Sequence, residues 1–472
     1  MTQASLPNAR RVALIVACAF FMQNLDGAII NTSLPQMAAS FGVQPLDLSL
    51  GITIYMLMVA ACVPASAWIA DRFGARNVFL LAVIVFSASS LACGLATSLP
   101  MFVAARALQG IGGAMMTPVG RMVVLRHASK AELLQATALI TWPALIAPVI
   151  GPVLGGVITT YVSWRWNFLL NVPLGIVGAW LVYRFVPNLR SDEDVALDVR
   201  GFALASTSLV CLLYGLESFG HAHGRASVAL ALAIAGLCVG ALAMRHFQRV
   251  KQPLLDLASL RVQTFSMASV GAGNFFRMSI NATPFLLPLL FQVGFGLSAI
   301  ESGWLVLAYF AGNLGMKAVT TPTLQRFGFR SVLVINGLLA GLSLLACALL
   351  TRDTALPVTI AVMFIAGLTR SMQFTSLATL TFADIDGPQR NAAATLSTMT
   401  QQISMVLGVA VSALVIKMSQ AWHGTTGTGL ADFRAAFVAV GVLSIISALM
   451  FVRLPHDAGA DVSGHRPKTS AA

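Results

Sequence analysis

Long apolar stretches alternate with short polar segments along almost the whole chain. Fourteen of these stretches are long enough to cross a lipid bilayer, which takes about 20 residues of α-helix. A helix satisfies its backbone hydrogen bonds within one segment, so lipid favours helices for stretches of this kind. The sequence therefore predicts an all-α polytopic membrane protein with fourteen transmembrane helices, at about residues 12–34, 48–70, 77–97, 99–123, 136–159, 167–186, 201–219, 227–244, 265–291, 300–320, 331–350, 356–378, 394–416 and 434–452.

Composition supports the membrane assignment. Of the 472 residues, 57% are hydrophobic and only 10% are charged, whereas a soluble domain carries about 25% charged residues. The formal net charge of +12 is then best explained by basic cytoplasmic loops, and we expect no nucleic-acid binding. The six cysteines all lie within apolar stretches and none forms a CxxC motif, so we expect neither disulfides nor a bound metal.

The distribution of Lys and Arg predicts the orientation in the membrane. If the N-terminus is inside, the inner segments hold 20 of the 29 basic residues and the outer segments hold 5. Cytoplasmic loops carry such an excess, so we predict that both termini lie inside. The other 4 basic residues fall within predicted helices: Arg106, Arg277, Lys317 and Arg370.

A short sequence recurs in two inner loops. RFGAR at 72–76 joins the second and third predicted helices, and RFGFR at 326–330 joins the tenth and eleventh. Repeats of helical bundles are typical of transporters that alternate access around a central site. We therefore predict an N-terminal six-helix bundle at 1–190, a cytoplasmic linker with two inserted helices at 191–250, a C-terminal six-helix bundle at 251–455 and a disordered cytoplasmic tail at 456–472.

Asp26 is the acidic residue in the middle of the first apolar stretch. A carboxylate at that depth costs about 2.5–3.5 kcal/mol on insertion scales, which argues for a role beyond packing. Burial favours the protonated form of a carboxyl group, so Asp26 is a candidate to bind a proton from outside and release it inside. The alternative is a structural acid that hydrogen-bonds between helices. Asn24 and Asn31 flank it as candidate cavity-lining residues, although Asn31 could equally serve helix packing.

Arg106 is a candidate partner for this acid, seven residues into the fourth predicted helix. Its long side chain could simply extend to the membrane interface. Alternatively, its permanent charge could control the charge of a nearby carboxylate such as Asp26. Further side chains that we expect to line a cavity are Gln109, Met115, Arg277 and Asn281.

Five motifs occur in order along the chain: LDGAIINTSLP at 25–35, AWIADRFGARNVF at 67–79, RALQGIGGAMMTP at 106–118, PVIGPVLGG at 148–156 and WRWNFLLNVPLG at 164–175. Together they resemble the major facilitator superfamily, specifically its fourteen-helix drug:proton antiporters of the EmrB/QacA type. Each motif is weak alone, but five in this order are specific. The chain departs from the family pattern at Ala28, Ala67, Ala75 and Asn167, where Thr, Gly, a basic residue and Ile are usual.

The resemblance implies roles for two further groups of residues. A conformational latch would form at the second inner loop, with Asp71 against the positively polarised N-terminal end of the thirteenth helix. Its residues would be Asp71, Arg72, Gly74 and Arg76, and the missing basic residue at Ala75 would weaken it. A bend that shapes the antiporter cavity would form in the fifth helix, where proline removes a backbone hydrogen bond. Its residues, which could also be a packing face, would be Gly151, Pro152, Gly155 and Gly156.

These observations predict proton-coupled efflux of hydrophobic or amphipathic small molecules across a bacterial inner membrane, by alternating access. The predicted partners are the substrate, protons and lipid, and a periplasmic adaptor with an outer-membrane channel is conceivable; we expect the monomer to be functional. An uptake or facilitative carrier is an alternative, and a non-transporting membrane sensor is another. The sequence has no Walker phosphate loop, HExxH or GxSxG motif, so we expect no ATP use, no enzymatic activity and no cofactor. The basic excess within the predicted helices slightly favours anionic or zwitterionic substrates.

Overall fold

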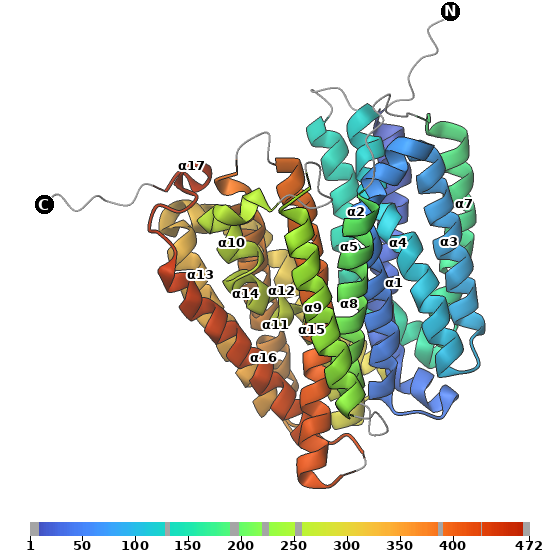
Figure 1. Cartoon of the computed structure of the whole chain (residues 1–472). Helices are drawn as coiled ribbons and strands as arrows, with labels where there is room; N and C mark the ends of the chain where they lie inside the picture. The colour runs from blue at the N-terminus through green and yellow to red at the C-terminus, as the bar shows by residue number, and fades with distance from the viewer. Residues whose placement is uncertain are drawn as a thin grey trace, which may run out of the picture. The chain divides into compact units, whose positions relative to one another are not determined.

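The computed structural model describes residues 9–127, 133–188, 198–219, 226–250, 257–385, 390–425 and 427–465. These residues form helices and connecting segments, with no β-strand among them (Figure 1). Helix occupies most of each of the fourteen predicted apolar stretches, which confirms the all-α membrane fold. Within the described ranges, nine helices are long and apolar enough to cross a membrane. The count of fourteen crossings and the inside position of both termini stay predictions.

The chain forms two compact units. Unit 1 comprises Met1–Val210 with Ser298–Gly303, and unit 2 comprises Cys211–Leu297 with Trp304–Ala472. The division falls within helix α8 (Val199–Phe219), inside the predicted pair of inserted helices. The predicted limits of the two bundles therefore stay predictions.

Unit 1 is a set of helices packed around an aromatic and aliphatic core. Helix α1 packs along α5, while α4 packs against both α2 and α3. Phe79 and Phe86 of α3 are completely buried in this core. A side chain at Gly112 of α4 would place its Cβ 2.8 Å from the backbone nitrogen of Phe86, so glycine is needed for the close approach of α4 and α3. The helices of unit 1 before α8 are α1 (Ala9–Phe41), α2 (Ser49–Phe73), α3 (Ala75–Leu95), α4 (Leu99–His127), α5 (Leu133–Tyr161), α6 (Trp166–Leu169) and α7 (Asn171–Phe185).

Unit 2 contains the helices that follow α8. Helix α13 packs against α14 and α16, and α11 packs against α15 and α16. Small hydroxyl side chains connect α11 and α16: Ser279 donates to the carbonyl of Val440 at 2.7 Å, and Ser447 donates to the carbonyl of Ala272 at 2.7 Å. The helices of unit 2 are α9 (Ala226–Phe247), α10 (Gln263–Ser269), α11 (Ala272–Leu289), α12 (Ala299–Gly315, from Trp304 onward), α13 (Lys317–Leu349), α14 (Leu356–Ala383), α15 (Arg390–His423), α16 (Leu430–Met450) and α17 (Ala460–Ser463).

The two copies of the RFG sequence adopt similar backbone turns. Gly74 has φ +90° and Gly328 has φ +70°, a region that residues with a side chain rarely adopt. Gly74 separates α2 from α3, and Gly328 is the one non-helical residue within α13. Each glycine is covered by a polar side chain from later in its own unit, Asn188 over Gly74 and His465 over Gly328. The sequence repeat is thus also a repeat of local structure.

The predicted disordered tail is partly folded. Residues 456–465 form turns and the short helix α17, and Ala458 and Ser463 are buried. This part of the tail is ordered because Gly459 packs against the ring of Phe329, the residue that follows Gly328 in the second RFG turn. The polar composition of the tail gave no indication of this contact. Residues 466–472 lie outside the described part of the chain.

Candidate functional site

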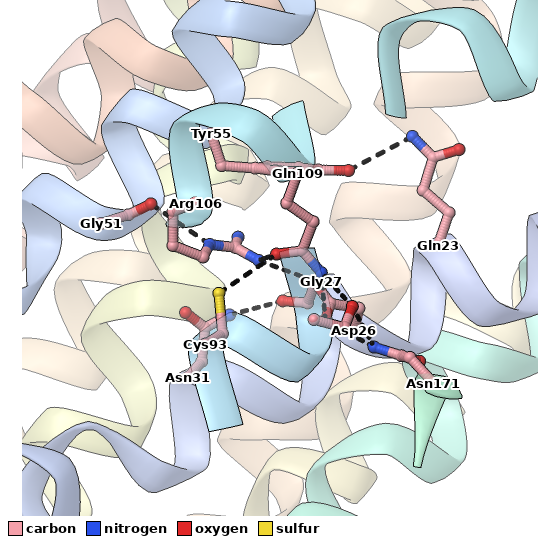
Figure 2. Close-up of polar contacts among 11 residues, drawn as sticks. Gln23, Asp26, Gly27, Asn31, Gly51, Tyr55, Cys93, Arg106, Gln109 and Asn171 are labelled. Atoms are coloured by element: carbon pink, nitrogen blue, oxygen red, sulfur yellow. Dashed lines mark hydrogen bonds and ion pairs between the residues drawn. The ribbon is translucent and has the colours of Figure 1, made fainter. Parts of the chain in front are cut away.

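Asp26 and Arg106 form a buried ion pair within unit 1. The Nη1 atom of Arg106 lies 2.7 Å from Oδ2 of Asp26, and each side chain is 1% exposed. Asp26 comes from α1 and Arg106 from α4 (Figure 2). Removing two such charges from water is expensive, and the pair is stable only if further hydrogen bonds satisfy the remaining polar atoms.

Two amide side chains provide those hydrogen bonds to the carboxylate. Gln109 Nε2 donates to Asp26 Oδ1 at 3.0 Å, and Asn171 Nδ2 of α7 donates to the same atom at 2.8 Å. Both amides also donate to Ser90 Oγ of α3, at 2.7 and 3.3 Å respectively. Gln109 accepts a hydrogen bond from Arg106 Nη1 at 2.5 Å, so the cation, the amides and the acid form one connected network.

Helix α2 completes the surroundings of Arg106. Arg106 Nε donates to the carbonyl of Gly51 at 3.3 Å, and the guanidinium carbon of Arg106 lies 4.2 Å from the centre of the Tyr55 ring. The Tyr55 hydroxyl accepts a hydrogen bond from Gln23 at 3.3 Å, as Figure 2 shows. Arg106 is therefore held on three sides, by an acid, an aromatic face and a backbone carbonyl.

The local sequence explains why these groups meet. Arg106 and Gln109 are three residues apart in a helix and therefore lie on one face of α4. The same helix carries Gly110 and Gly113, whose missing side chains allow Tyr55 of α2 to approach. Chemically, the site directs three donor groups, from Arg106, Gln109 and Asn171, at the Asp26 carboxyl group and places that group beside a buried cation. Adding a proton to Asp26 would cancel the charge on which Arg106 depends.

The structure thus brings together Asp26, Arg106 and Gln109 from the predicted residues and adds three that sequence reasoning missed. These are Ser90, Asn171 and Tyr55. Asn171 lies within the WRWNFLLNVPLG motif, so a polar residue in an apolar stretch was an available signal for it. Ser90 had no such signal, because small hydroxyl residues are common in membrane helices.

Asn24 and Asn31 bond to their own helix. Asn24 Nδ2 donates to the carbonyl of Phe20 at 2.8 Å, and Asn31 Nδ2 donates to the carbonyl of Gly27 at 3.4 Å. Met115 is half-buried and lines an apolar hollow of about 570 Å³ formed by residues of α2, α3 and α4. None of the three contacts the Asp26 network through a described hydrogen bond, and their role in a substrate cavity stays a prediction.

Arg277 occupies a break between two helices of unit 2. It is 2% exposed, and its Nη1 donates to the carbonyls of Ala268 at 2.6 Å and Ser269 at 3.4 Å, at the end of α10. A cation at the carboxyl end of a helix is favourable. The structure therefore places Arg277 as a cap on α10, while Asn281, one helical turn further along α11, is half-buried. Cavity lining by both residues stays a prediction.

The latch residues surround the first RFG turn. Arg76 places its guanidinium carbon 5.8 Å from the centre of the Tyr183 ring, and its Nη2 donates to Oδ1 of Asn77 at 3.3 Å. Gly74 lies under Asn188. Asp71 and Arg72 are in the last turn of α2, where Asp71 is half-buried and Arg72 is exposed. A latch function of this loop stays a prediction.

The glycines of α5 provide its contact with α1. A Cβ on Gly151 would lie 2.6 Å from Cβ of Ala28, and one on Gly155 would lie 2.6 Å from Oγ1 of Thr32. Pro152 and Gly156 are also buried on this helix. The packing interpretation of these residues thus has direct structural support, and the antiporter bend stays a prediction.

Comparisons with known proteins agree with this architecture. The family model described as the Major Facilitator Superfamily matches residues 16–273 and 267–471. The chain is 36% identical over 477 residues to the "Putative multidrug resistance protein MdtD" of Escherichia coli O6:H1, with 99% of each chain covered. It is 35% identical to the protein of the same name in Citrobacter koseri, with 98% of this chain and 99% of the relative covered. These relatives are MdtD proteins rather than EmrB or QacA.

Solved transporter structures share the fold. A bacterial homologue of the human lysosomal transporter Spinster matches with a TM-score of 0.68 at 16% identity, over 99% of this chain and 100% of that chain. A D-xylose–proton symporter matches with a TM-score of 0.67 at 14% identity, over 95% of this chain and 99% of that chain. At these identities the likeness concerns the fold alone.

Proposed function

Because this chain belongs to the major facilitator superfamily, we propose that it exports hydrophobic or amphipathic small molecules in exchange for protons. The full-length identity to relatives named as multidrug resistance proteins supports export of toxic compounds. We place the protein in the inner membrane of a bacterial cell as a functional monomer. A periplasmic adaptor and an outer-membrane channel are optional partners in this scheme.

The observation that carries the proposal is the desolvated pair of Asp26 and Arg106, with 2.7 Å between Oδ2 and Nη1. In the ionised state the carboxylate balances the charge of Arg106 and accepts hydrogen bonds from Gln109 and Asn171. Protonation of Asp26 removes that balance and leaves a buried cation without a counter-ion, which costs about 3–5 kcal/mol when one partner of a buried pair is lost. The protonated and ionised states therefore favour different arrangements of α1 and α4.

Such a difference couples proton movement to conformation. A proton that binds Asp26 from the outer side and leaves to the inner side moves down the membrane potential, which supplies about 2.3 kcal/mol per 100 mV. Gln109 and Asn171 can serve both states, because an amide donates to a carboxylate and its carbonyl oxygen can accept from a carboxylic acid. Alternating access by two bundles is the cycle that this switch would drive, with the RFG loops as its latches.

A transport assay in proteoliposomes tests the proposal. The purified protein is reconstituted with an acidic interior, and a panel of amphipathic antimicrobial compounds is added outside. Proton antiport predicts accumulation of a transported compound together with proton efflux, reported by a pH-sensitive dye in the buffer outside. The Asp26→Asn variant is expected to lose gradient-driven accumulation. It should be less stable than the parent protein, because Arg106 loses its counter-ion, but still folded at the assay temperature, which its thermal unfolding curve checks.

Asp353→Asn is the matched control, because it removes one negative charge from an exposed turn of the described chain. It should transport like the parent protein. Accumulation driven only by the opposite gradient would favour the uptake alternative, and unchanged gradient-driven transport by Asp26→Asn would remove Asp26 from the coupling mechanism.

A further inference from the structure

Unit 2 carries a hollow of about 350 Å³ whose wall is polar and acidic. Its volume lies within the range of small-molecule sites, about 300–1,000 Å³. Three segments that are distant in the sequence form the wall: the start of α10, the residue after the end of α14, and the part of the tail at 455–461. Asp384, Asp457 and Asp461 all line this hollow.

Gly459 brings the tail to the end of α14. A Cβ on this glycine would lie 2.7 Å from Cδ2 of Phe329 and 3.3 Å from Cβ of Ala383, the last residue of α14. Helix α10 also packs against α14, so the three segments meet at one place. Asp457 and Asp461, two residues before and two residues after the glycine, therefore share a hollow with Asp384.

The three carboxylates are exposed and unpaired. None of them accepts a hydrogen bond or forms an ion pair within the described part of the chain, although Arg261 and Arg453 are near them in the sequence. The whole chain has only 17 acidic residues, so three at one hollow are a local concentration of negative charge. Like charges repel one another, and a bound cation would remove that repulsion.

Thr264 adds an unused hydrogen-bonding group to the same wall. It is the second residue of α10 and is 4% exposed, and its Oγ1 is buried without a hydrogen-bond partner among the residues that the structure describes. Buried side-chain oxygens nearly always have a partner, so an unused one calls for an explanation. A hydroxyl oxygen can accept a hydrogen bond from an ammonium group, which is the kind of ligand that the carboxylates favour.

The arrangement does not suit a single metal ion. In the described ranges, no group of three or more His, Cys, Asp and Glu side chains could hold a metal ion. The negative charges are therefore spread along the hollow and do not converge on one point. A ligand that matches them carries several positive groups separated along a chain.

We propose that this hollow binds a linear polyamine, an organic cation with two or more ammonium groups. The ammonium groups donate to the carboxylates of Asp384, Asp457 and Asp461 in charge-assisted hydrogen bonds, and Thr264 Oγ1 accepts a further one. Binding holds the tail segment against α10 and α14. The inference goes beyond the proposed transport function, because the hollow lies in unit 2 and contains no residue of the Asp26 network.

Isothermal titration calorimetry tests the site, with spermidine and Mg²⁺ as separate probes. The purified full-length protein is titrated in detergent at constant ionic strength. The parent protein should bind a single spermidine per chain, more tightly than Mg²⁺. Asp384→Asn, Asp457→Asn and Asp461→Asn should each weaken spermidine binding about tenfold, the effect of losing one hydrogen bond to a charged group. The triple variant should show no saturable binding, and Thr264→Val should weaken binding less than the single acid variants.

Asp353→Asn is the matched control, because it makes the same change at an exposed turn whose residues do not line the hollow. It should bind spermidine like the parent protein. Gly459→Val keeps every acid but displaces the tail from Phe329, so it should lose spermidine binding as the triple variant does. Thermal unfolding without ligand shows that each variant is folded.

Three results would overturn the assignment: no saturable spermidine binding by the parent protein, spermidine binding that survives in the triple variant or in Gly459→Val, or equally tight binding of Mg²⁺ with the same dependence on the three acids. Asp26→Asn separates this inference from the proposed function. It should bind spermidine like the parent protein even though it has lost proton-driven transport, so either proposal can fail while the other stands.

Discussion

Asn171 donates a hydrogen bond of 2.8 Å to Oδ1 of Asp26 across a separation of 145 residues in the chain. The bond joins α7 to α1 and fixes one oxygen of the carboxylate, while Arg106 contacts the other. Asn171 thereby makes the position of the acid depend on the last helix of the predicted first bundle.

Replacing Asn171 by Ala should destabilise the protein and weaken transport. A hydrogen bond to a charged group contributes about 1.5–3 kcal/mol, and its removal also leaves a cavity beside Ser90. We expect a lower unfolding midpoint in detergent and a several-fold slower proton-driven transport. Asn77→Ala is the control, since Asn77 is exposed and its described hydrogen bonds join it to its neighbour Arg76 and to the carbonyl of Phe73. An unfolding midpoint equal to that of the control would contradict a stabilising role of Asn171.

Arg106→Gln should be much more destabilising than the simultaneous replacement of both charges. The single variant leaves a buried carboxylate without its cation, which costs about 3–5 kcal/mol. The double variant, Asp26→Asn with Arg106→Gln, removes both charges and should recover most of that loss. Chemical unfolding of the parent protein, both single variants and the double variant gives the coupling energy. A coupling energy near zero would show that the contact between the two side chains contributes nothing to stability.

Gly112→Val should separate α4 from α3. The new side chain would meet the Phe86 backbone, which cannot move aside as a flexible side chain would. Overpacking of this kind costs about 1–3 kcal/mol. The matched change is Gly178→Ala, where the nearest atom to an added Cβ is Val83 Cγ1 at 3.9 Å. That variant should be as stable as the parent or slightly more stable, because alanine is the better helix former. Thermal unfolding in detergent distinguishes the two, and equal midpoints would argue against the close contact.

Gly74→Ala should destabilise the first RFG turn for two separable reasons. The Gly74 backbone, at φ +90° and ψ 129°, lies in a region that residues with a side chain rarely adopt, and placing such a residue there costs about 1–3 kcal/mol. The added Cβ would also collide with the amide of Asn188. In the Asn188→Ala background only the backbone cost remains, so the effect of Gly74→Ala should be smaller there. An equal effect in both backgrounds would show that Asn188 moves aside freely.

The lengths of the apolar stretches and the positions of the charged residues were enough to predict the membrane fold and the approximate positions of the helices. They also identified the two main candidate site residues, Asp26 and Arg106. These features are local: a stretch of about 20 apolar residues indicates a membrane helix whatever it packs against, and a charge within it stands out at once. The superfamily resemblance also followed from motifs that each lie within about a dozen residues.

Only the tertiary structure decided which groups meet. Ser90 and Asn171 complete the Asp26 network from helices far away in the sequence, Arg277 caps a break in its own stretch, and Gly459 anchors part of a polar tail on Phe329. Such contacts depend on how helices are rotated and brought together. A hydrogen bond between residues 145 positions apart cannot be predicted from the pattern of residues in a single sequence.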